Sequence, residues 1–234
     1  MHPLPPSDQA AVSQGNGCLS GYIIPPLMVV VLSCLLASFT FKNSVDPEGM
    51  LVDMPQEVVQ DVPVPDRSAA EISQVFTEEV RYWALPIQNW AAAAGLDPDL
   101  AATIMQIESC GDPRALSRSG ATGLFQVMPY HFLATEDPFD PETNAMRGLD
   151  YLRRSLETAS GEPRLAMAGY NGGIGVIGNG ETSWAAETIR YAYWGSGIYL
   201  EAKSGATESL RLQEWLEAGG ASLCRQAHTR LGLP

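Results

Sequence analysis

This chain is best interpreted from two neighbouring segments, Ile107-Glu108-Ser109-Cys110-Gly111 and Gly120-Ala121-Thr122-Gly123-Leu124-Phe125-Gln126-Val127-Met128-Pro129. The first ends an apolar helix predicted to begin at Pro98, and the second is a Gly-rich turn that returns toward it. A carboxylate in the last turn of a helix faces the negative end of the helix dipole, and apolar neighbours such as Ile104 further disfavour the charged form. The sequence therefore predicts that Glu108 is a carboxylic acid with a raised pKa, suited to donating a proton.

Apolar residues at helical spacing extend in both directions from these segments. Ser68-Ala69-Ala70-Glu71 is a capping box before an apolar run that continues to Val80. Asp97-Pro98 and Asp140-Pro141 each place a capping side chain before a proline suited to a first helical turn. Further helices are predicted at Pro163–Gly169, at Ser183–Trp194 and in two C-terminal segments. Sustained alternation of apolar and polar residues is missing, so the fold class is predicted to be all-α.

Composition excludes several classes of partner. The chain has 234 residues, 45% of them hydrophobic, and a net charge of −13. A nucleic-acid-binding protein needs Lys and Arg clustered on one face, so no nucleic acid is expected as a partner. Attraction to anionic lipid headgroups is excluded for the same reason. Any acidic polymer must be held by hydrogen bonds and shape.

The chain also lacks a recognisable site for a metal or a cofactor. None of its four cysteines forms a Cys-x-x-Cys pair, and its three histidines lie far apart in sequence. The segment from Gly173 to Gly178 spells the dinucleotide fingerprint, but it follows a predicted helix instead of a strand, so nucleotide binding is rejected. Cys110 and Cys224 belong to the globular region and could pair in an oxidising compartment. Two independent buried thiols are the alternative.

The N-terminal third has a different character. Residues 1–21 are a polar tail, and residues 22–41 are almost wholly apolar. That run is close to the ~20 residues that a membrane-spanning helix needs, while its core from Leu27 is nearer a signal peptide, so either a transmembrane anchor or a signal segment is expected. Residues 42–67 carry acidic residues and prolines and read as an extended linker. A globular domain is expected at 68–200, with a helical extension packed on it at 201–234.

Four sequence blocks occur in order between Leu85 and about Tyr193: Glu108–Pro129, Asp140–Leu152, Ala168–Gly173 and Glu187–Tyr191. Together they resemble the catalytic domain of the soluble lytic transglycosylase family, which has a lysozyme-like fold similar to that of goose-type lysozyme. The C-terminal extension matches no block of that family.

The resemblance implies an enzyme of the bacterial cell envelope that cleaves peptidoglycan. Glu108 would be the single catalytic acid and base: it protonates the bond between N-acetylmuramic acid and N-acetylglucosamine, then deprotonates the C6 hydroxyl that attacks C1. The product is a 1,6-anhydromuramoyl end, and no cofactor or metal is needed. Tyr170 is the best candidate to hydrogen-bond Glu108. The matching positions that line the groove or orient the glutamate are Ser109, Gln126, Met128, Tyr170, Asn171 and Tyr191.

Departures from the family pattern leave alternatives open. Phe125 stands where the family often has Met, Gly169 interrupts the usual Ala-Tyr, and Gly172-Gly173 replaces Ala-Gly. A hydrolytic lysozyme on the same fold would need a second carboxylate, for which Asp112 and Asp137 are the residues to consider, or a positioned water. A peptidoglycan-binding protein without turnover is a further alternative.

Overall fold

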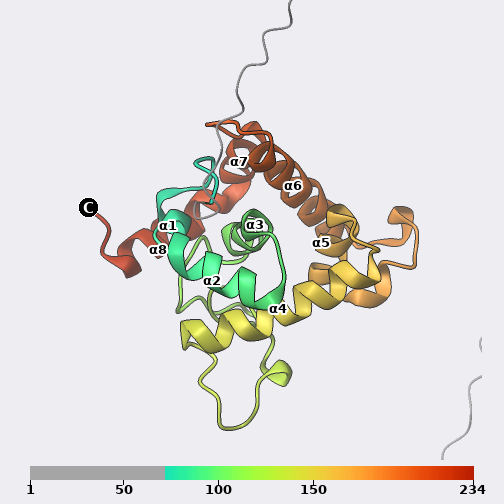
Figure 1. The fold of residues 1–234 in the computed structure, drawn as a ribbon, viewed down its shortest axis with the longest axis horizontal. Helices are drawn as coiled ribbons and strands as arrows, with labels where there is room; N and C mark the ends of the chain where they lie inside the picture. Colours follow the sequence, from blue (N-terminus) through green and yellow to red (C-terminus); the bar gives the residue numbers. More distant parts are fainter. Residues whose placement is uncertain (1–71) are drawn as a thin grey trace, which may run out of the picture. The chain divides into compact units, whose positions relative to one another are not determined.

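The structure is a computed structural model, and it describes residues 72–234 (Figure 1). Within that range the secondary structure is helical, with isolated β-bridges and no β-strand, which confirms the all-α prediction. The polar tail, the apolar segment 22–41 and the linker 42–67 lie outside the described residues. Among residues 72–234, no helix combines the length and the apolar character needed to cross a bilayer.

Most of the helices are joined by short connections, and a long loop, residues 109–140, separates two of them. Three-residue 3₁₀ turns lie at Pro129–His131, Ile174–Val176 and Glu181–Ser183, and a π-helical turn, η4, spans Leu216–Gly220. The α-helices are α1 (Glu78–Arg81), α2 (Ala84–Ala94), α3 (Pro98–Glu108), α4 (Pro141–Thr158), α5 (Pro163–Gly172), α6 (Ala186–Lys203), α7 (Leu210–Trp215) and α8 (Ala221–Leu231).

Two helix starts follow the predicted capping signals. The Asp97 carboxylate accepts a hydrogen bond from the Asp99 amide at 2.9 Å, at the start of α3. The Asp140 carboxylate accepts from the Thr143 amide at 2.9 Å, at the start of α4. Each side chain satisfies an amide that has no partner within its helix, which is why the sequence signal was reliable here.

The helix predicted after the capping box is wrong over most of its length. Residues 72–77 are not helical, and only the short α1 follows them. The reason is tertiary: the Ser73 amide donates to Asp99 at 2.7 Å and the Thr77 amide donates to Gln106 at 3.1 Å. Side chains of α3 thus replace the carbonyl partners that a helix would supply, while Phe76 is buried in the core.

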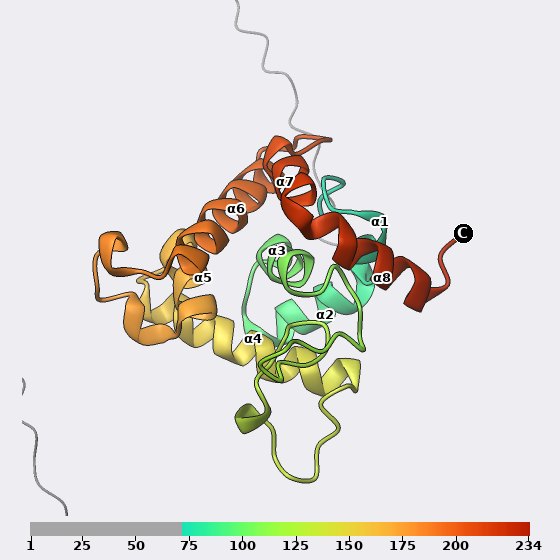
Figure 2. The same cartoon turned by 180° about the vertical axis from the view of Figure 1, so that it is seen from behind.

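Helix α3 is the centre of the domain. Every residue from Asp99 to Ile107 is buried, and both views of the ribbon place α3 inside a ring formed by the other helices (Figures 1 and 2). Its neighbours include α2 and α6, which pack against it directly. Because α3 is enclosed on all sides, the position of its last residue, Glu108, is set by the packing of the whole core.

The long loop between α3 and α4 is fastened by one buried amide. The Asn144 side chain is fully buried; it donates to the carbonyl of Thr122 at 2.8 Å and to that of Pro138 at 2.9 Å, and it accepts from the Phe125 amide at 2.9 Å. Three backbone groups of the loop therefore depend on a single side chain of α4.

Replacing Asn144 with alanine is expected to lower the free energy of unfolding by about 3 kcal/mol. The loss leaves three buried backbone groups without partners, each worth roughly 1 kcal/mol or more. Urea denaturation measures the change. Asn179→Ala is the control, because Asn179 is exposed and donates one hydrogen bond to Gly175. A loss for Asn144→Ala no greater than that of the control would contradict the assignment.

Candidate active site

Glu108 is the last residue of α3 and is partly buried. The hydroxyl of Tyr191, on α6, donates a hydrogen bond to its Oε1 at 2.8 Å. The pKa of Glu108 is raised to about 8: burial is the largest cause, the Tyr191 hydrogen bond opposes it, and the nearby charge of Glu187 adds to it. The predicted raised pKa is thus explained mainly by desolvation. At neutral pH the side chain is a protonated acid.

The predicted hydrogen bond from Tyr170 to Glu108 is wrong, since the partner is Tyr191. The Tyr170 hydroxyl donates to the carbonyl of Phe125 at 2.7 Å and so supports the Gly-rich loop. Both tyrosines lie near Glu108, whose charge, together with burial, raises the pKa of each phenol well above its ordinary value. Tyr191 is the hydrogen-bond partner of Glu108 because α6 packs directly on α3, whereas Tyr170 comes from α5.

Ser109 and Gln126 hold the Gly-rich loop against the end of α3. The Ser109 hydroxyl donates to the Leu124 carbonyl at 2.7 Å, and Ser109 is only 1% exposed. Gln126 has a left-handed backbone with φ of 46°. Its side-chain amide nitrogen donates to the carbonyl of Gly123 at 3.0 Å and to that of Ala115 at 3.3 Å. Because Ser109 is buried, its role is to position the loop, whereas Gln126 also lines a cavity beside Glu108.

Glu108 lies between two cavities, which we name by their neighbours. The α8-side cavity, of about 260 Å³, is lined by Glu108, Gln126 and residues of α8. The α6-side cavity, of about 380 Å³, is lined by Glu108, Tyr191 and Asn171. Of the predicted site residues, the structure thus brings Glu108, Ser109, Gln126, Asn171 and Tyr191 to these two cavities.

Met128 and Tyr170 line a third cavity, of about 270 Å³, which shares Gln126 with the α8-side cavity and Asn171 with the α6-side cavity. A row of aromatic rings runs along it: Tyr130 and His131 are 4.5 Å apart, His131 and Tyr151 5.0 Å, and Tyr151 and Tyr170 5.6 Å between centroids. Tyr130 and His131 were not predicted to be site residues, although an aromatic pair directly after Met128-Pro129 is a usable signal. This row extends the site away from Glu108.

Neither carboxylate considered as a second catalytic group stands free. Asp112 is buried, accepts from the Arg114 amide at 2.9 Å and pairs with Arg230 at 3.4 Å. Asp137 is exposed and accepts from the Phe139 amide at 2.9 Å. Both therefore stabilise turns, although Asp112 also borders the α8-side cavity. The acid that shares the α6-side cavity with Glu108 is Glu187, in the first turn of α6.

Two departures from the family pattern, Phe125 and Gly169, fall on packing positions, whereas Gly172 and Gly173 line the third cavity. Phe125 is fully buried, and a side chain at Gly148 of α4 would come within 2.5 Å of it. Gly169 is buried where a side chain would collide with Ser155 of α4. These residues shape the core and the approach of α4 and α5 rather than the groove surface.

Within residues 72–234, one group of side chains has the composition of a metal site: Glu79, Cys110 and Cys224. The sulfur atoms of the two cysteines are bonded to each other in a disulfide, so they do not offer thiolate ligands.

An apolar cavity of about 440 Å³ between α2 and α4, lined by Trp90 and Met146, does not include Glu108.

Comparison with known proteins gives consistent results. Residues 86–191 match the model of the family described as the transglycosylase SLT domain. The chain is 35% identical over 111 residues to the transglycosylase of Enterobacteria phage PRD1, covering 47% of this chain and 40% of that protein. It is 50% identical over 46 residues to the endo-type membrane-bound lytic murein transglycosylase A of Klebsiella pneumoniae (19% and 23%). It is 31% identical over 113 residues to the membrane-bound lytic murein transglycosylase C of Yersinia pestis (39% and 31%). The match spans less than half the length of each of these relatives.

A raised pKa of Glu108 has a consequence for stability. An unfolded glutamate ionises near pH 4.5, whereas the folded side chain stays protonated up to about pH 8. Folding is therefore progressively disfavoured by this group as pH rises from 4.5 to 8, and the penalty is constant above that window.

Glu108→Gln is accordingly expected to raise the melting temperature, with a gain that is near zero at pH 4 and grows until about pH 8. Thermal unfolding of both proteins at a series of pH values measures this gain. Glu208→Gln makes the same chemical change at an exposed position and controls for a general charge effect. A gain that is independent of pH would show that Glu108 is not held protonated by the fold.

Proposed function

Residues 86–191 are a transglycosylase SLT domain, and on that premise we propose that this protein is a lytic transglycosylase that cleaves the glycan strands of peptidoglycan with Glu108 as its single acid and base. The observation that carries the proposal is the environment of Glu108. A carboxyl group with a pKa of about 8 is protonated at neutral pH, as a general acid must be before it meets its substrate.

The first step is protonation of the leaving group. Glu108 donates its proton to the glycosidic oxygen that joins C1 of N-acetylmuramic acid to C4 of N-acetylglucosamine. The bond between C1 and that oxygen breaks, and the N-acetylglucosamine end leaves with a free C4 hydroxyl. Glu108 becomes a carboxylate, which the Tyr191 hydroxyl stabilises through its hydrogen bond at 2.8 Å.

The second step closes a ring within the substrate. The C6 hydroxyl of the muramoyl residue bonds to C1 while the Glu108 carboxylate accepts the hydroxyl proton. The product is the 1,6-anhydro sugar, no water is consumed, and Glu108 returns to its protonated state. One carboxyl group can therefore serve both steps, in contrast to glycosidases that place two across the bond.

The cavities beside Glu108 suit a neutral contact with an acidic strand. Because the chain carries a net charge of −13, its overall electrostatic interaction with a polymer that bears carboxylates is repulsive. The amide of Gln126 borders the α8-side cavity and that of Asn171 the α6-side cavity, and the thioether of Met128 borders the third cavity, which both amides also line. We propose that these side chains bind the strand, as the family resemblance implies.

Hydrolysis by a lysozyme-type reaction is the second candidate, and Glu187 is the observation that favours it. Its carboxylate lies on the α6-side cavity with Glu108, where it could deprotonate a water molecule. Glu187 is exposed at the start of α6. Its carboxylate is therefore little desolvated, and it lacks the buried environment that most strengthens a catalytic base in an active site.

We also propose that the domain works outside the cytoplasm, in the cell envelope. The Cys110–Cys224 disulfide of the structure is the kind of bond that persists in an oxidising compartment. The apolar segment 22–41, as an anchor or a signal, would direct the domain there.

Glu108→Gln is expected to reduce the release of muropeptides from purified peptidoglycan by about 10²–10⁴-fold, because the amide cannot donate or accept the catalytic proton. Mass spectrometry of the products made by the wild-type protein is expected to show anhydro ends, one water lighter than hydrolytic ends. Hydrolytic ends would refute the transglycosylase reaction. Equal and poor release by both proteins would instead indicate a binding protein without turnover.

A Glu187→Gln variant gives a second way to distinguish the transglycosylase reaction from hydrolysis. If the proposal is right, anhydro products persist within about tenfold of the wild-type rate, and the alkaline limb of the pH–rate profile moves to lower pH. The shift follows because the Glu187 charge raises the pKa of Glu108, so its removal lowers that pKa. Loss of all activity with an unchanged fold would favour a hydrolytic role for Glu187.

A further inference from the structure

We propose that the segment Leu210–Leu231, which comprises α7, η4 and α8 and lies beyond the family match, is a wall of the substrate groove and that Leu223 and Gln226 of α8 contact the glycan strand beside Glu108. We call this segment the C-terminal wall. The identity of the ligand rests on the proposed function, whereas the location of the binding surface rests on the structure alone.

The C-terminal wall borders both cavities next to the acid. Leu223 and Gln226 line the α8-side cavity together with Glu108, Gln126 and residues 115–117 of the family-matched region. On the α6-side cavity, Trp215 and Ala218 stand with Glu108 and Tyr191. The family match ends at residue 191, so each cavity owes part of its lining to a segment outside the matched domain.

The chemistry of the α8-side cavity fits one N-acetylated sugar ring. Leu223 is partly buried there, and Leu116 opposite is 65% exposed. Such apolar side chains suit the C–H face of a pyranose. Gln226 is exposed and Gln126 lies on the same cavity. The side-chain nitrogen of Gln126 already donates to Gly123 and Ala115, so its Oε1 is the atom that can accept from a ring hydroxyl. The side-chain nitrogen of Gln226 donates to Ser222 at 3.2 Å, which leaves its second N–H as a donor and its Oε1 as an acceptor for ring hydroxyls and an acetamido group.

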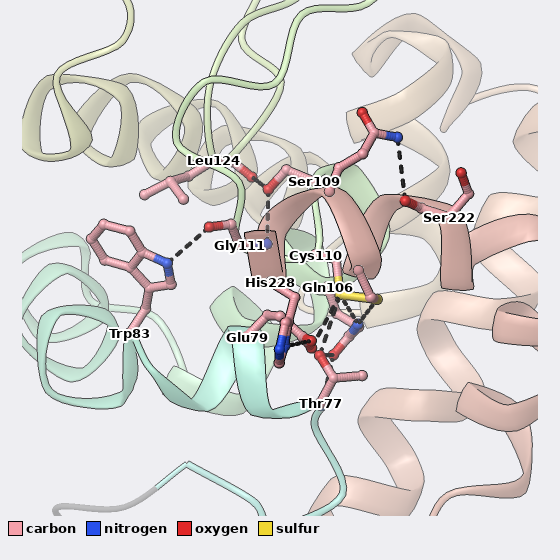
Figure 3. The surroundings of a disulfide bond; sticks show 12 residues. Thr77, Glu79, Trp83, Gln106, Ser109, Cys110, Gly111, Leu124, Ser222 and His228 are labelled. Carbon is pink, nitrogen blue, oxygen red and sulfur yellow. Dashed lines mark hydrogen bonds and ion pairs between the residues drawn. A yellow bond between two sulfur atoms is a disulfide. The ribbon is translucent and has the colours of Figure 1, made fainter. Parts of the chain in front are cut away.

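The C-terminal wall is fastened to the helix that carries the acid. Cys224 lies between the two proposed contact residues and is bonded to Cys110, two residues after Glu108. Figure 3 shows this disulfide beside Gln106, whose amide donates to the Cys110 sulfur at 3.1 Å, with the pair of His228 and Glu79 at 3.1 Å next to it. Because the disulfide joins α8 directly to the turn after Glu108, the wall and the acid keep a fixed separation.

The binding test uses the full-length Glu108→Gln protein, which binds without turnover, and a soluble tetrasaccharide of alternating N-acetylglucosamine and N-acetylmuramic acid. Adding Leu223→Ala and Gln226→Ala is expected to weaken the Kd measured by calorimetry about tenfold, the loss of a hydrogen bond and an apolar contact. Arg225→Ala in the same background is the matched control. Arg225 is exposed on the same helix but lines neither cavity beside Glu108, so its change should stay within about twofold.

The same substitutions in the active protein are expected to raise KM for soluble glycan strands about tenfold and to leave kcat within about threefold, with unchanged products. Parental melting temperatures establish that the variants are folded. An unchanged Kd and KM in the double variant would overturn the proposal. If the wild-type protein released hydrolytic ends, the proposed reaction would fall, yet the binding comparison would still decide whether the wall contacts the strand.

The role of the disulfide has its own variant. Cys224→Ser in the Glu108→Gln background keeps Leu223 and Gln226 but frees α8 from the turn after Glu108. A weakening of the tetrasaccharide Kd of about threefold or more supports the anchored wall, and an unchanged Kd shows that the disulfide does not position it.

Discussion

One constraint shapes the whole domain, the enclosure of α3 by the other helices. The hydrogen bond from Tyr191 to Glu108 forms within this enclosed environment. A helix buried from Asp99 to Ile107 delivers its last side chain to one place and surrounds it with low-dielectric material. Desolvation then keeps the carboxyl group protonated, and the Tyr191 hydroxyl moderates that effect by favouring the carboxylate. An acid with a pKa near 8 that is also able to ionise is what the proposed two-step reaction requires.

Polar side chains, rather than the apolar core, arrange the backbone around this acid. Ser109 ties the Gly-rich loop to the end of α3, Asn144 fastens the same loop from α4, and Tyr170 supports it from α5. Three helices therefore converge on one loop, which carries Gln126 and Met128 to the cavities. The residues with the clearest family resemblance thus divide into those that face the groove and those that hold the loop in place.

The C-terminal wall shows how a shared domain can acquire a surface of its own. The family match contains the acid, its tyrosine partner and the loop, whereas the two cavities beside Glu108 also take residues from α7, η4 and α8. If α8 contacts the strand, as we propose, this protein's preference among glycan substrates is set partly by a segment that lies outside the family match. The disulfide would then link the helix that contacts the substrate to the turn that follows the catalytic acid.

The all-α class and the helix starts at Asp97 and Asp140 could be predicted because each depends on neighbours in the chain, since capping and periodicity are local. The raised pKa of Glu108 was predicted from the helix end and its apolar neighbours, whereas its largest cause in the structure is burial by the whole core. The choice of Tyr191 over Tyr170, the non-helical course of residues 72–77 and the burial of Phe125 could not be predicted, since each is settled by partners more than 20 residues away. The sequence by itself determined which carboxyl group is the candidate acid. Tertiary structure alone decided what surrounds it, because the packing of α6 on α3 and the bond from α8 to Cys110 join segments that no local pattern relates.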